Sequence, residues 1–431
     1  MDAERFLFSL SRFGIKLGLQ PTISFTQKLG NPQNYFRSVH VGGSNGKGST
    51  TTFIYRILQK KYTAGLYVSP HIRNFTERIV VSGEEISWNF IENFIKRNRT
   101  NINLNGNYVQ LTFFEYTTAM AFQYFKDKNV EYAAIEVGMG GRLDSTNVIT
   151  PELSVITSIS MEHADKLGGN IDDIAREKGG IIKSERPVLL GRMPERAKAV
   201  LTKIAEGKKS RILDIEQTEI SNIDFRLDGT SFKLKTDKDV YDVNLRALGN
   251  HQVINSTMAI LAYEDIGNGI SKEDTMAAIA SEGIPGRFEI RRTNPLIVLD
   301  GAHNSEAVRT LASNVKLYHI KNPLIVLGIL RDKNSYNMLQ QLSEISDRVI
   351  VTEPNERERR KTHDQLAREA SFFFKDVEKF HKPESAIDAA LAENTNVIIT
   401  GSLYLVGEAE KILDRKFGPN SLPVESTEVN T

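Results

Sequence analysis

Apolar and polar residues follow one another along the chain in a pattern that predicts helices and strands in turn. Short apolar runs bounded by glycine and polar residues predict buried strands, and stretches with apolar residues three or four positions apart predict helices. Residues 210–246 alternate over shorter runs, with Asp228-Gly229 as a turn, which predicts a small antiparallel sheet. In the rest of the first two thirds, strands are expected at 36–41, 132–137 and 153–159, and helices at 48–60, 113–128, 171–182 and 251–266.

Beyond Pro285-Gly286 the predicted strands and helices alternate regularly. The strands are LIVLD at 296–300, PLIVLGI at 323–329, RVIVTE at 348–353 and NVIITG at 396–401. This rhythm predicts a parallel sheet covered by helices. A chain of 431 residues is also too long for one core. We therefore expect an α/β protein with a domain at 1–286, a smaller Rossmann-like α/β domain at 287–418, and a disordered polar tail at 419–431.

Composition and charge narrow the classes of function. Hydrophobic residues make up 40% and charged residues 25%, as in ordinary globular proteins, and the formal net charge of +1 gives no general attraction to nucleic acid or anionic membranes. The absence of cysteine excludes disulfides, thiolate metal sites and cysteine nucleophiles. Because the N-terminal stretch lacks an unbroken apolar region and no run of about 18 apolar residues occurs, we expect a cytoplasmic protein without a membrane span.

A glycine-rich loop follows the first predicted strand. HVGGSNGKGST at 40–50 is similar to the phosphate-binding P-loop G-x-x-x-x-G-K-S/T, but Val41 replaces the first glycine and Gly48 replaces the hydroxyl residue after the lysine. A strand, a glycine turn and a helix direct backbone N–H groups at one point, which suits a phosphate, and Lys47 adds a positive charge. A plain turn with a solvent-facing lysine is the less favoured alternative. The motif alone fits a kinase, a GTPase or a ligase.

Gly48 indicates that a magnesium ion accompanying the nucleotide is held largely from elsewhere in the chain. Magnesium prefers oxygen ligands, and Glu136 ends a buried strand, where a carboxylate is costly unless it is paired or binds a cation. The alternative is a carboxylate satisfied by backbone amides of the next glycine loop. Ser69, His163 and Lys178 are further candidates. Taken alone, each has a more ordinary explanation: Ser69 as a turn or cap residue, His163 as a structural histidine and Lys178 as a solvated helix lysine.

A series of motifs runs through nearly the whole chain. They are LGLQPTI at 17–23, HVGGSNGKGST at 40–50, SPHIRNFTERI at 69–79, TFFEYTTAMAF at 112–122, EVGMGGRLDSTNV at 136–148, ITSISMEHADKLG at 156–168, IAREKGGIIK at 174–183, GNHQVINSTMA at 249–259, IPGRFEI at 284–290, LDGAHNSEAVRTL at 299–311 and GSLYLVGE at 401–408. Together they resemble the folylpolyglutamate synthase / dihydrofolate synthase family, a branch of the Mur ligases, which are ATP-dependent amide-forming enzymes. The chain departs from the family at Ser44, where threonine is more frequent, and at Met161 and Glu162, where leucine or glycine and aspartate are common.

The resemblance implies that the first domain is a P-loop-type ATP-binding domain with a mainly parallel sheet. One magnesium ion would be held by Ser69, Glu136 and His163. Lys178 would be carbamylated, and the carbamate, an anion with two oxygens, would be a ligand for a second magnesium ion. The residues implied to contact ATP are Ser44, Asn45, Gly46, Lys47, Gly48, Ser49, Asn255, Arg287 and Asp300. For Arg287 the alternative is a salt bridge at a hinge.

The resemblance also implies where the other substrates bind. The pterin side would contact Leu17, Gly18, Thr112, Phe113, Phe114, Glu115, Leu143, Asp144 and Ser145, with core packing as the alternative for the two phenylalanines. In the C-terminal glutamate-binding ligase domain, His303 and Ser402 would position the incoming glutamate. The implied catalytic residues are Lys47, Lys178, Arg287 and His303.

The implied activity is the ATP-dependent addition of L-glutamate to a folate, to dihydropteroate, or to both, through an acyl phosphate. ATP, L-glutamate and the pterin substrate would be the partners, without nucleic acid or membrane, and members of the family are usually monomeric. Alternatives are another Mur-type amino-acid ligase acting on a modified pterin or a peptidoglycan precursor, a P-loop kinase or phosphohydrolase, and a non-catalytic nucleotide-binding module. A kinase needs no second, amine-binding domain, so the strands and helices beyond residue 296 argue against it.

Overall fold

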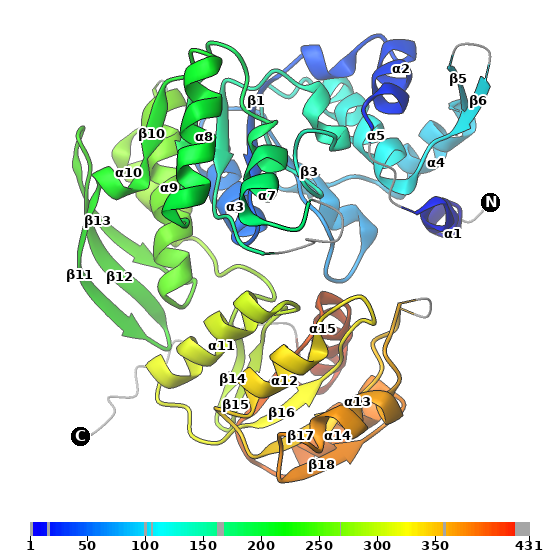
Figure 1. Ribbon diagram of the computed structural model, residues 1–431, viewed down its shortest axis with the longest axis vertical. Coiled ribbons are helices and arrows are strands. Elements are labelled where there is room, and N and C mark those ends of the chain that lie inside the picture. The colour runs from blue at the N-terminus through cyan, green and yellow to red at the C-terminus, as the bar shows by residue number, and fades with distance from the viewer. Residues whose placement is uncertain are drawn as a thin grey trace. The chain divides into compact units, whose positions relative to one another are not determined.

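The computed structural model describes residues 3–14, 18–98, 101–104, 107–161, 168–267, 269–356 and 359–418. The predicted tail at 419–431, Leu17 and His163 lie outside these residues. The described part of the chain forms two compact units of helices and strands, coloured along the chain in Figure 1. Unit 1 comprises Met1–Ser221, Lys233–Asp242 and Gln252–Ile279, and unit 2 comprises Asn222–Phe232, Val243–His251 and Ala280–Thr431.

Unit 1 is built on a mainly parallel sheet, as the sequence predicts. Within the described residues its eight strands run in the order β10-β9-β8-β1-β7-β2-β3-β4, and only β3 pairs antiparallel, with β2 and β4. Strand β1 lies between β7 and β8, so the loops that follow these strands meet at one edge. The strands are β1 (Arg37–Gly42), β2 (Ala64–Tyr67), β3 (Ile79–Val81), β4 (Glu84–Glu85), β7 (Tyr132–Glu136), β8 (Leu153–Ile156), β9 (Val188–Leu190) and β10 (Ile212–Asp214).

Helices cover this sheet and bury its apolar strands. The aromatic core of unit 1 includes Phe25, Tyr116, Phe122 and Phe125, all fully buried, and Phe25 stacks on Tyr116 with the ring centres 5.5 Å apart. The α-helices are α1 (Ala3–Ser9), α2 (Gln20–Lys28), α3 (Lys47–Leu58), α4 (Trp88–Arg97), α5 (Phe113–Asp127), α7 (Ile171–Gly179), α8 (Glu195–Gly207), α9 (Asn250–Ile266) and α10 (Lys272–Ala280). Short 3-10 helices lie at Leu10–Phe13, Pro32–Asn34, Phe75–Arg78, Ser145–Val148 and Ile215–Gln217, and a ribbon of β5 (Asn101–Leu104) and β6 (Asn107–Gln110) follows α4.

A small three-stranded sheet occupies the predicted region 210–246. Its described strands are β11 (Glu219–Arg226), β12 (Gly229–Lys235) and β13 (Val240–Leu245), in that order. The first turn is at Leu227 and Asp228, one residue earlier than predicted, and Gly229 already begins β12. A Cβ on Gly229 would lie 2.6 Å from the carbonyl oxygen of Leu245, so this glycine serves a close approach of two strands.

Unit 2 contains the regular strand–helix alternation predicted beyond residue 296. Within the described residues the sheet order is β14-β15-β19-β16-β17-β18, parallel except for β14. Its strands are β14 (Glu289–Thr293), β15 (Leu296–Leu299), β16 (Leu324–Leu327), β17 (Arg348–Val351), β18 (Asp376–Lys379) and β19 (Val397–Thr400). The flanking helices, visible in Figure 1, are α11 (Ser305–Leu317), α12 (Ser335–Leu342), α13 (His363–Ala370), α14 (Pro383–Ala392) and α15 (Leu403–Phe417). The predicted α/β fold class is confirmed in both parts of the chain.

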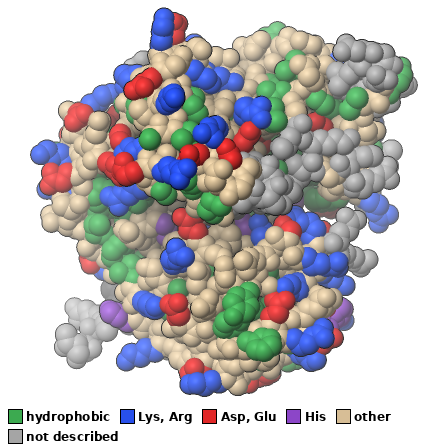
Figure 2. All heavy atoms as spheres, viewed as in Figure 1, with side chains coloured by type: hydrophobic (Ala, Val, Ile, Leu, Met, Phe, Trp, Pro, Cys, Tyr) green, Lys and Arg blue, Asp and Glu red, His purple; other side chains and the backbone are tan. Residues whose placement is uncertain are grey.

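The face of the molecule shown in Figure 2 carries no patch of a single charge sign within the part of the chain that the structure describes. Side chains of both charge signs are interspersed over the face shown in Figure 2. Among the described residues, no helix has the length and apolar character that a membrane span requires. Local sites therefore have to account for the function.

Candidate active site

The glycine-rich loop between β1 and α3 is fastened to the segment that follows β8. Gly43 has a φ of 142°, and a Cβ at this position would lie 2.0 Å from the hydroxyl oxygen of Thr157, so a larger residue does not fit. The Ser44 amide donates to the carbonyl oxygen of Ser158 at 2.8 Å, and the Asn45 amide donates to the Ser158 hydroxyl at 3.0 Å. The chain turns toward the loop here, which is why β8 ends at Ile156 rather than at the predicted residue 159.

Helix α9 supports the loop from another side. Gly46 has a φ of 83°, and a Cβ there would lie 2.5 Å from Oδ1 of the buried Asn255. The Thr50 hydroxyl donates to the same oxygen at 3.4 Å, and Asn255 Nδ2 donates to Oε1 of Gln252 at 3.0 Å. Asn255, an expected ATP contact, therefore also fixes the backbone of the loop.

Two lysine side chains reach one backbone oxygen of the loop. The Lys47 ammonium donates to the carbonyl oxygens of Gly43 at 3.1 Å and of Ser44 at 2.9 Å. The Lys178 ammonium donates to the same oxygen of Gly43 at 2.8 Å, and Lys178 is only 3% exposed. Two positive charges so close together repel each other, most strongly where water is excluded. The arrangement places the Lys47 charge within the glycine-rich loop, where an anion such as phosphate can bind.

The loop after β7 holds Lys178 in this position. A Cβ on Gly141 would lie 2.7 Å from the carbonyl oxygen of Glu177, so the loop packs directly on the last turn of α7. The Arg142 amide donates to that oxygen at 2.7 Å, and the Arg142 guanidinium donates twice to the Glu177 carboxylate, at 2.8 and 3.0 Å. The interpretation of Lys178 as a solvated helix lysine is thus wrong, because the contact between this loop and α7 buries it.

Glu136 lies next to the position at which the P-loop pattern has its hydroxyl. The residue ends β7 and is 5% exposed. A Cβ on Gly48 would lie 3.5 Å from one carboxylate oxygen of Glu136 and 3.7 Å from the other. The backbone amide of Ser69, which follows β2, donates to the first oxygen at 2.9 Å. The structure therefore brings Glu136, Ser69 and the loop together, whereas the third expected magnesium ligand, His163, lies outside the described residues.

The expected pterin residues at the start of α5 form a helix cap. The Thr112 hydroxyl accepts from the Glu115 amide at 3.3 Å, while one Glu115 oxygen accepts from the Thr112 amide and hydroxyl at 2.7 and 2.8 Å. The other carboxylate oxygen of Glu115 is buried and has no hydrogen-bond partner among the described residues. Buried acceptors in native proteins usually have a donor, so this oxygen is an unusual feature of the segment.

The two phenylalanines of this segment are half-buried and pack on other aromatic rings. Phe113 stacks on Phe8 with a centre-to-centre distance of 5.6 Å and an angle of 9° between the planes. Phe114 stacks on Tyr67 at 6.0 Å, and a Cβ on Gly138 would lie 2.5 Å from its ring. Core packing, the alternative explanation for these two residues, therefore accounts for part of their environment. Both rings also keep some exposed surface.

Asp144 is buried and accepts hydrogen bonds from its own loop. Its oxygens accept from the Met139 amide at 2.8 Å, from the Thr146 amide at 3.0 Å and from the Thr146 hydroxyl. Burial raises the pKa of Asp144 despite these donors. The Thr146 hydroxyl also contacts Nε2 of His40 at 2.8 Å, and burial lowers the pKa of His40 to about 3 and keeps it neutral. Of the other expected pterin residues, Ser145 is buried and Gly18 and Leu143 are half-buried.

In unit 2, the expected ATP and glutamate residues gather where β15 and β19 end. These strands are parallel neighbours, and Asp300 and Ser402 follow them. Asp300 accepts from the Phe288 and Ala302 amides, each at 2.8 Å, and burial raises its pKa to about 6, against the opposing effect of Arg287. A Cβ on Gly301 would lie 2.6 Å from the Arg287 guanidinium.

His303 and Ser402 lie at the starts of two helices in unit 2. His303 Nδ1 is 2.8 Å from the carbonyl oxygen of Gly301 and precedes Asn304, the N-cap of α11. The Ser402 hydroxyl caps α15 by accepting from the Leu405 amide at 3.2 Å. Free N–H groups at helix starts attract anions such as carboxylates.

Several residues that build the site were not singled out from the sequence. Thr157 and Ser158 fasten the loop, Arg142 positions α7, and the buried His251 lies near Arg287, which together with burial lowers the pKa of His251 to about 4. The signal that could have found the first pair is their place directly after a buried strand next to the loop. The other two depend on contacts between segments far apart in the sequence, which no local pattern carries.

Comparison with known proteins identifies the family. Residues 41–263 match the Mur ligase middle domain, and residues 286–403 match the Mur ligase glutamate ligase domain. The chain is 34% identical to dihydrofolate synthase/folylpolyglutamate synthase of Bacillus subtilis over 427 residues, which is 96% of this chain and 98% of the relative.

Solved structures agree over nearly the full length. Folylpolyglutamate synthase of Mycobacterium tuberculosis, in complex with ADP and AMPPCP, is 28% identical, with a TM-score of 0.86 and coverage of 96% of this chain and 99% of that chain. Escherichia coli FolC in complex with DHPP and ADP is 27% identical, with a TM-score of 0.84 and coverage of 96% and 98%. On these grounds, and as its motifs predict, the chain belongs to the folylpolyglutamate synthase / dihydrofolate synthase family of the Mur ligases.

Proposed function

We propose that this protein uses ATP to join the amine of L-glutamate to a carboxylate of a folate, of dihydropteroate, or of both. Membership of the family carries the ligase class, and relatives solved with ADP or AMPPCP support ATP as the co-substrate. The observation that carries the proposal within the chain itself is the Lys47 ammonium on the carbonyl oxygens of Gly43 and Ser44, because it places a positive charge in the glycine-rich loop at the start of α3, where a phosphate can bind. In our proposal residues 1–286 bind ATP and the pterin, residues 287–418 bind glutamate, and the protein acts as a monomer.

The reaction would pass through an acyl phosphate. A carboxylate oxygen of the pterin substrate attacks the γ-phosphorus of ATP and releases ADP, and the glutamate amine then attacks the activated carbonyl and releases phosphate. The protein has to position the reactants and neutralise the charge of the transferred phosphoryl group. Lys47 and Arg287 would neutralise that charge, and the loop residues Ser44, Asn45, Gly46, Gly48 and Ser49 would hold the phosphates, with Asn255 and Asp300 as further ATP contacts.

The residues beside the loop fit a magnesium ion. The Glu136 carboxylate is a hard oxygen donor beside Gly48, and Ser69, whose backbone amide donates to it, carries a hydroxyl oxygen of the same kind. We propose that these two and His163 hold one ion. Bound magnesium would neutralise phosphate charge and polarise the phosphoryl group.

A carbamate on Lys178 would resolve the repulsion between the two lysines. Carbamylation replaces a buried positive charge next to Lys47 with an anion carrying two oxygens. Such a group suits a second magnesium ion, since hard cations prefer oxygen ligands. The burial of Lys178 supports this role, because the side chain, at 3% exposure, points into the protein beside the glycine-rich loop and not into solvent.

We further propose the residues that hold the two other substrates. The half-buried rings of Phe113 and Phe114 and the unpartnered oxygen of Glu115 suit a flat heterocycle with N–H donors. Thr112, Leu143, Asp144, Ser145 and Gly18 would complete the pterin site, together with Leu17. His303 and Ser402, at the starts of α11 and α15, would position the carboxylates of glutamate.

A product assay tests the function directly. The purified protein is incubated with ATP, magnesium and L-glutamate, and with either dihydropteroate or tetrahydrofolate as the acceptor. We expect a product heavier by one glutamyl residue with at least one acceptor, formed together with ADP and phosphate. Phosphate release that does not depend on glutamate would contradict the proposal and indicate a phosphohydrolase or a kinase.

Lys47→Ala should lower kcat/KM for ATP by about 100-fold or more, because the charge aimed at the outer phosphates is lost. Lys60→Ala, which removes an exposed lysine just after the same helix, is the matched control and should keep the wild-type rate. Turnover of the Lys47 variant near that of the control would refute the phosphate role.

Glu136→Gln keeps the side-chain volume and removes the charge. We expect the magnesium concentration at half-maximal rate to rise by about tenfold or more, since even outer-shell partners of a metal change its affinity by about 10–100-fold. Glu131→Gln is the control, because that carboxylate also accepts a backbone amide, from Thr63 at 2.8 Å, but lies at the other end of β7. Identical magnesium titrations for both variants would mean that Glu136 is structural.

Lys178→Ala and Lys178→Arg separate a carbamate from a simple cation at this position. Arginine keeps a positive charge but cannot form the carbamate, so both variants should lose nearly all turnover. A small carboxylic acid in solution should restore part of the activity of the alanine variant by supplying the missing oxygens. An arginine variant that turns over normally, or intact mass and electron density showing an unmodified lysine in the fully active enzyme, would rule the carbamate out.

A further inference from the structure

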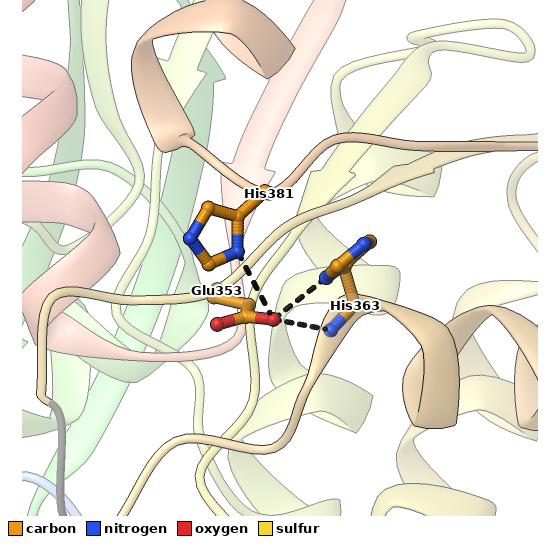
Figure 3. Close-up of side chains that lie close together, drawn as sticks. All are labelled: Glu353, His363 and His381. Atoms are coloured by element: carbon orange, nitrogen blue, oxygen red, sulfur yellow. Dashed lines mark hydrogen bonds and ion pairs between the residues drawn. The ribbon is translucent and has the colours of Figure 1, made fainter.

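Three side chains able to bind a metal converge in unit 2, and the mechanism above uses none of them. They are Glu353, His363 and His381, drawn in Figure 3. One carboxylate oxygen of Glu353 lies 2.6 Å from Nδ1 of His363 and 3.4 Å from Nδ1 of His381. The three candidate ligand atoms all lie within 4.8 Å of one another.

The fold holds these residues at one edge of the sheet. Strands β17 and β18 are parallel neighbours, with Val351 opposite Lys379. Glu353 and His381 each come two residues after these positions, so the chain brings them to the same edge. His363 is the first residue of α13, and its backbone amide also donates to Glu353, at 3.1 Å. Three segments separate in the sequence therefore supply one ligand each.

The distances from Glu353 to the two histidines bracket or match the spacing of ligands in a tetrahedral metal site. With metal–ligand bonds of about 2.0–2.1 Å, tetrahedral ligands lie about 3.3–3.4 Å apart. The 3.4 Å distance from Glu353 to His381 already has this value. The 2.6 Å distance from Glu353 to His363 is that of a hydrogen bond, so it has to lengthen by about 0.7 Å when the shared proton leaves.

We propose that Glu353, His363 and His381 bind a divalent transition-metal ion such as Zn²⁺. Two imidazole nitrogens and one carboxylate are typical ligands of Zn²⁺, Co²⁺ and Ni²⁺ and poor ligands for Mg²⁺, which prefers oxygen. The exposed fractions of the side chains fall from 58% for His381 through 23% for His363 to 3% for Glu353, so the ion enters from solvent. Three protein ligands leave a fourth position for water.

Charged neighbours set the strength of this site. Burial of Glu353 is outweighed by hydrogen bonds from His363 and by the Arg360 charge, which lower the pKa of Glu353 and keep the carboxylate ionised. The Arg360 guanidinium lies 3.0 Å from the second oxygen of Glu353 and competes with an ion for the carboxylate charge. Asp364 lies 3.7 Å from Nε2 of His363, where it can orient the ring, although Lys379 also pairs with Asp364 at 2.7 Å.

The ion would join the ends of β17 and β18 to the start of α13 and stabilise unit 2. It has no part in the ATP chemistry proposed for the loop in unit 1. The plain alternative is a buried carboxylate that is satisfied by Arg360 and two histidines, with no metal. In that case added metal ions would neither bind stoichiometrically nor stabilise the fold.

Titration of the metal-free full-length protein with Co²⁺, without nucleotide, tests the site. We expect one Co²⁺ per chain with the visible absorption of a four- or five-coordinate ion, displacement by Zn²⁺, and a higher unfolding temperature with metal. The titration is carried out on Glu136→Gln as well as on wild type, to separate any uptake at the proposed magnesium site. The cobalt ion bound by the Glu353, His363 and His381 cluster should give the same absorption bands in both proteins.

Single substitutions assign the ligands. His381→Ala should weaken binding by about tenfold or more and abolish the metal-dependent rise in unfolding temperature, and its folding is secure because the side chain is 58% exposed. Arg360→Gln should tighten binding, since the competing charge is removed. His319→Asn, which removes an exposed histidine elsewhere in unit 2, should change nothing. Absence of cobalt uptake by the wild type, or equal responses of wild type and His381→Ala, would overturn the proposal.

Discussion

The shared carbonyl oxygen of Gly43 is the contact on which the architecture of unit 1 depends. To place two lysine ammonium groups on it, the fold has to bring together the end of β1 and the last turn of α7. The strand order does this, because β1 lies between β7 and β8 and the loops after all three strands meet at one edge. The loop after β8 then fixes the glycine turn, and the loop after β7 fixes α7. Contacts of the two neighbouring loops, including the Arg142–Glu177 ion pair, therefore hold both lysine side chains at the Gly43 carbonyl oxygen.

The glycine that replaces the usual hydroxyl residue of the P-loop pattern lies beside a carboxylate. A Cβ at position 48 would lie 3.5 Å from one oxygen of Glu136, which is an ordinary contact distance. Gly48 places no side chain at this point, so the carboxylate lies directly beside the loop. Glu136 stands at the end of β7, the strand next to β1, where Val41 pairs with it in register. In our proposal this carboxylate supplies to magnesium the oxygen that the hydroxyl residue supplies in the usual P-loop pattern.

A feature of the fold or of the site was predictable from the sequence where its cause lies in neighbouring residues, and was not predictable where its cause is a contact between distant segments. Strands with unbroken apolar runs, such as Leu296–Leu299 and Val397–Thr400, and the glycine loop were predictable because their signals lie in neighbouring residues. The burial of Lys178 was not, because it follows from Gly141 and Arg142 packing on α7 more than thirty residues later. The family motifs predicted the site residues as a set, yet not that Thr112 and Glu115 cap α5 while one Glu115 oxygen stays unpartnered.

In unit 2, the buried carboxylate of Asp300 lowers the stability of the folded protein at neutral pH. Its pKa in the folded protein, about 6, lies above the ordinary value of about 4, so folding favours the protonated form. Its contribution to stability is present in full below pH 4 and is lost as the pH rises through 6. At neutral pH the Asp300 carboxylate is ionised although it is buried, which costs stability. Hydrogen bonds from the Phe288 and Ala302 amides and the charge of Arg287 reduce this cost. Such a cost is typical of residues retained for chemistry, and it lies at the strand end where ligands of parallel α/β sheets bind.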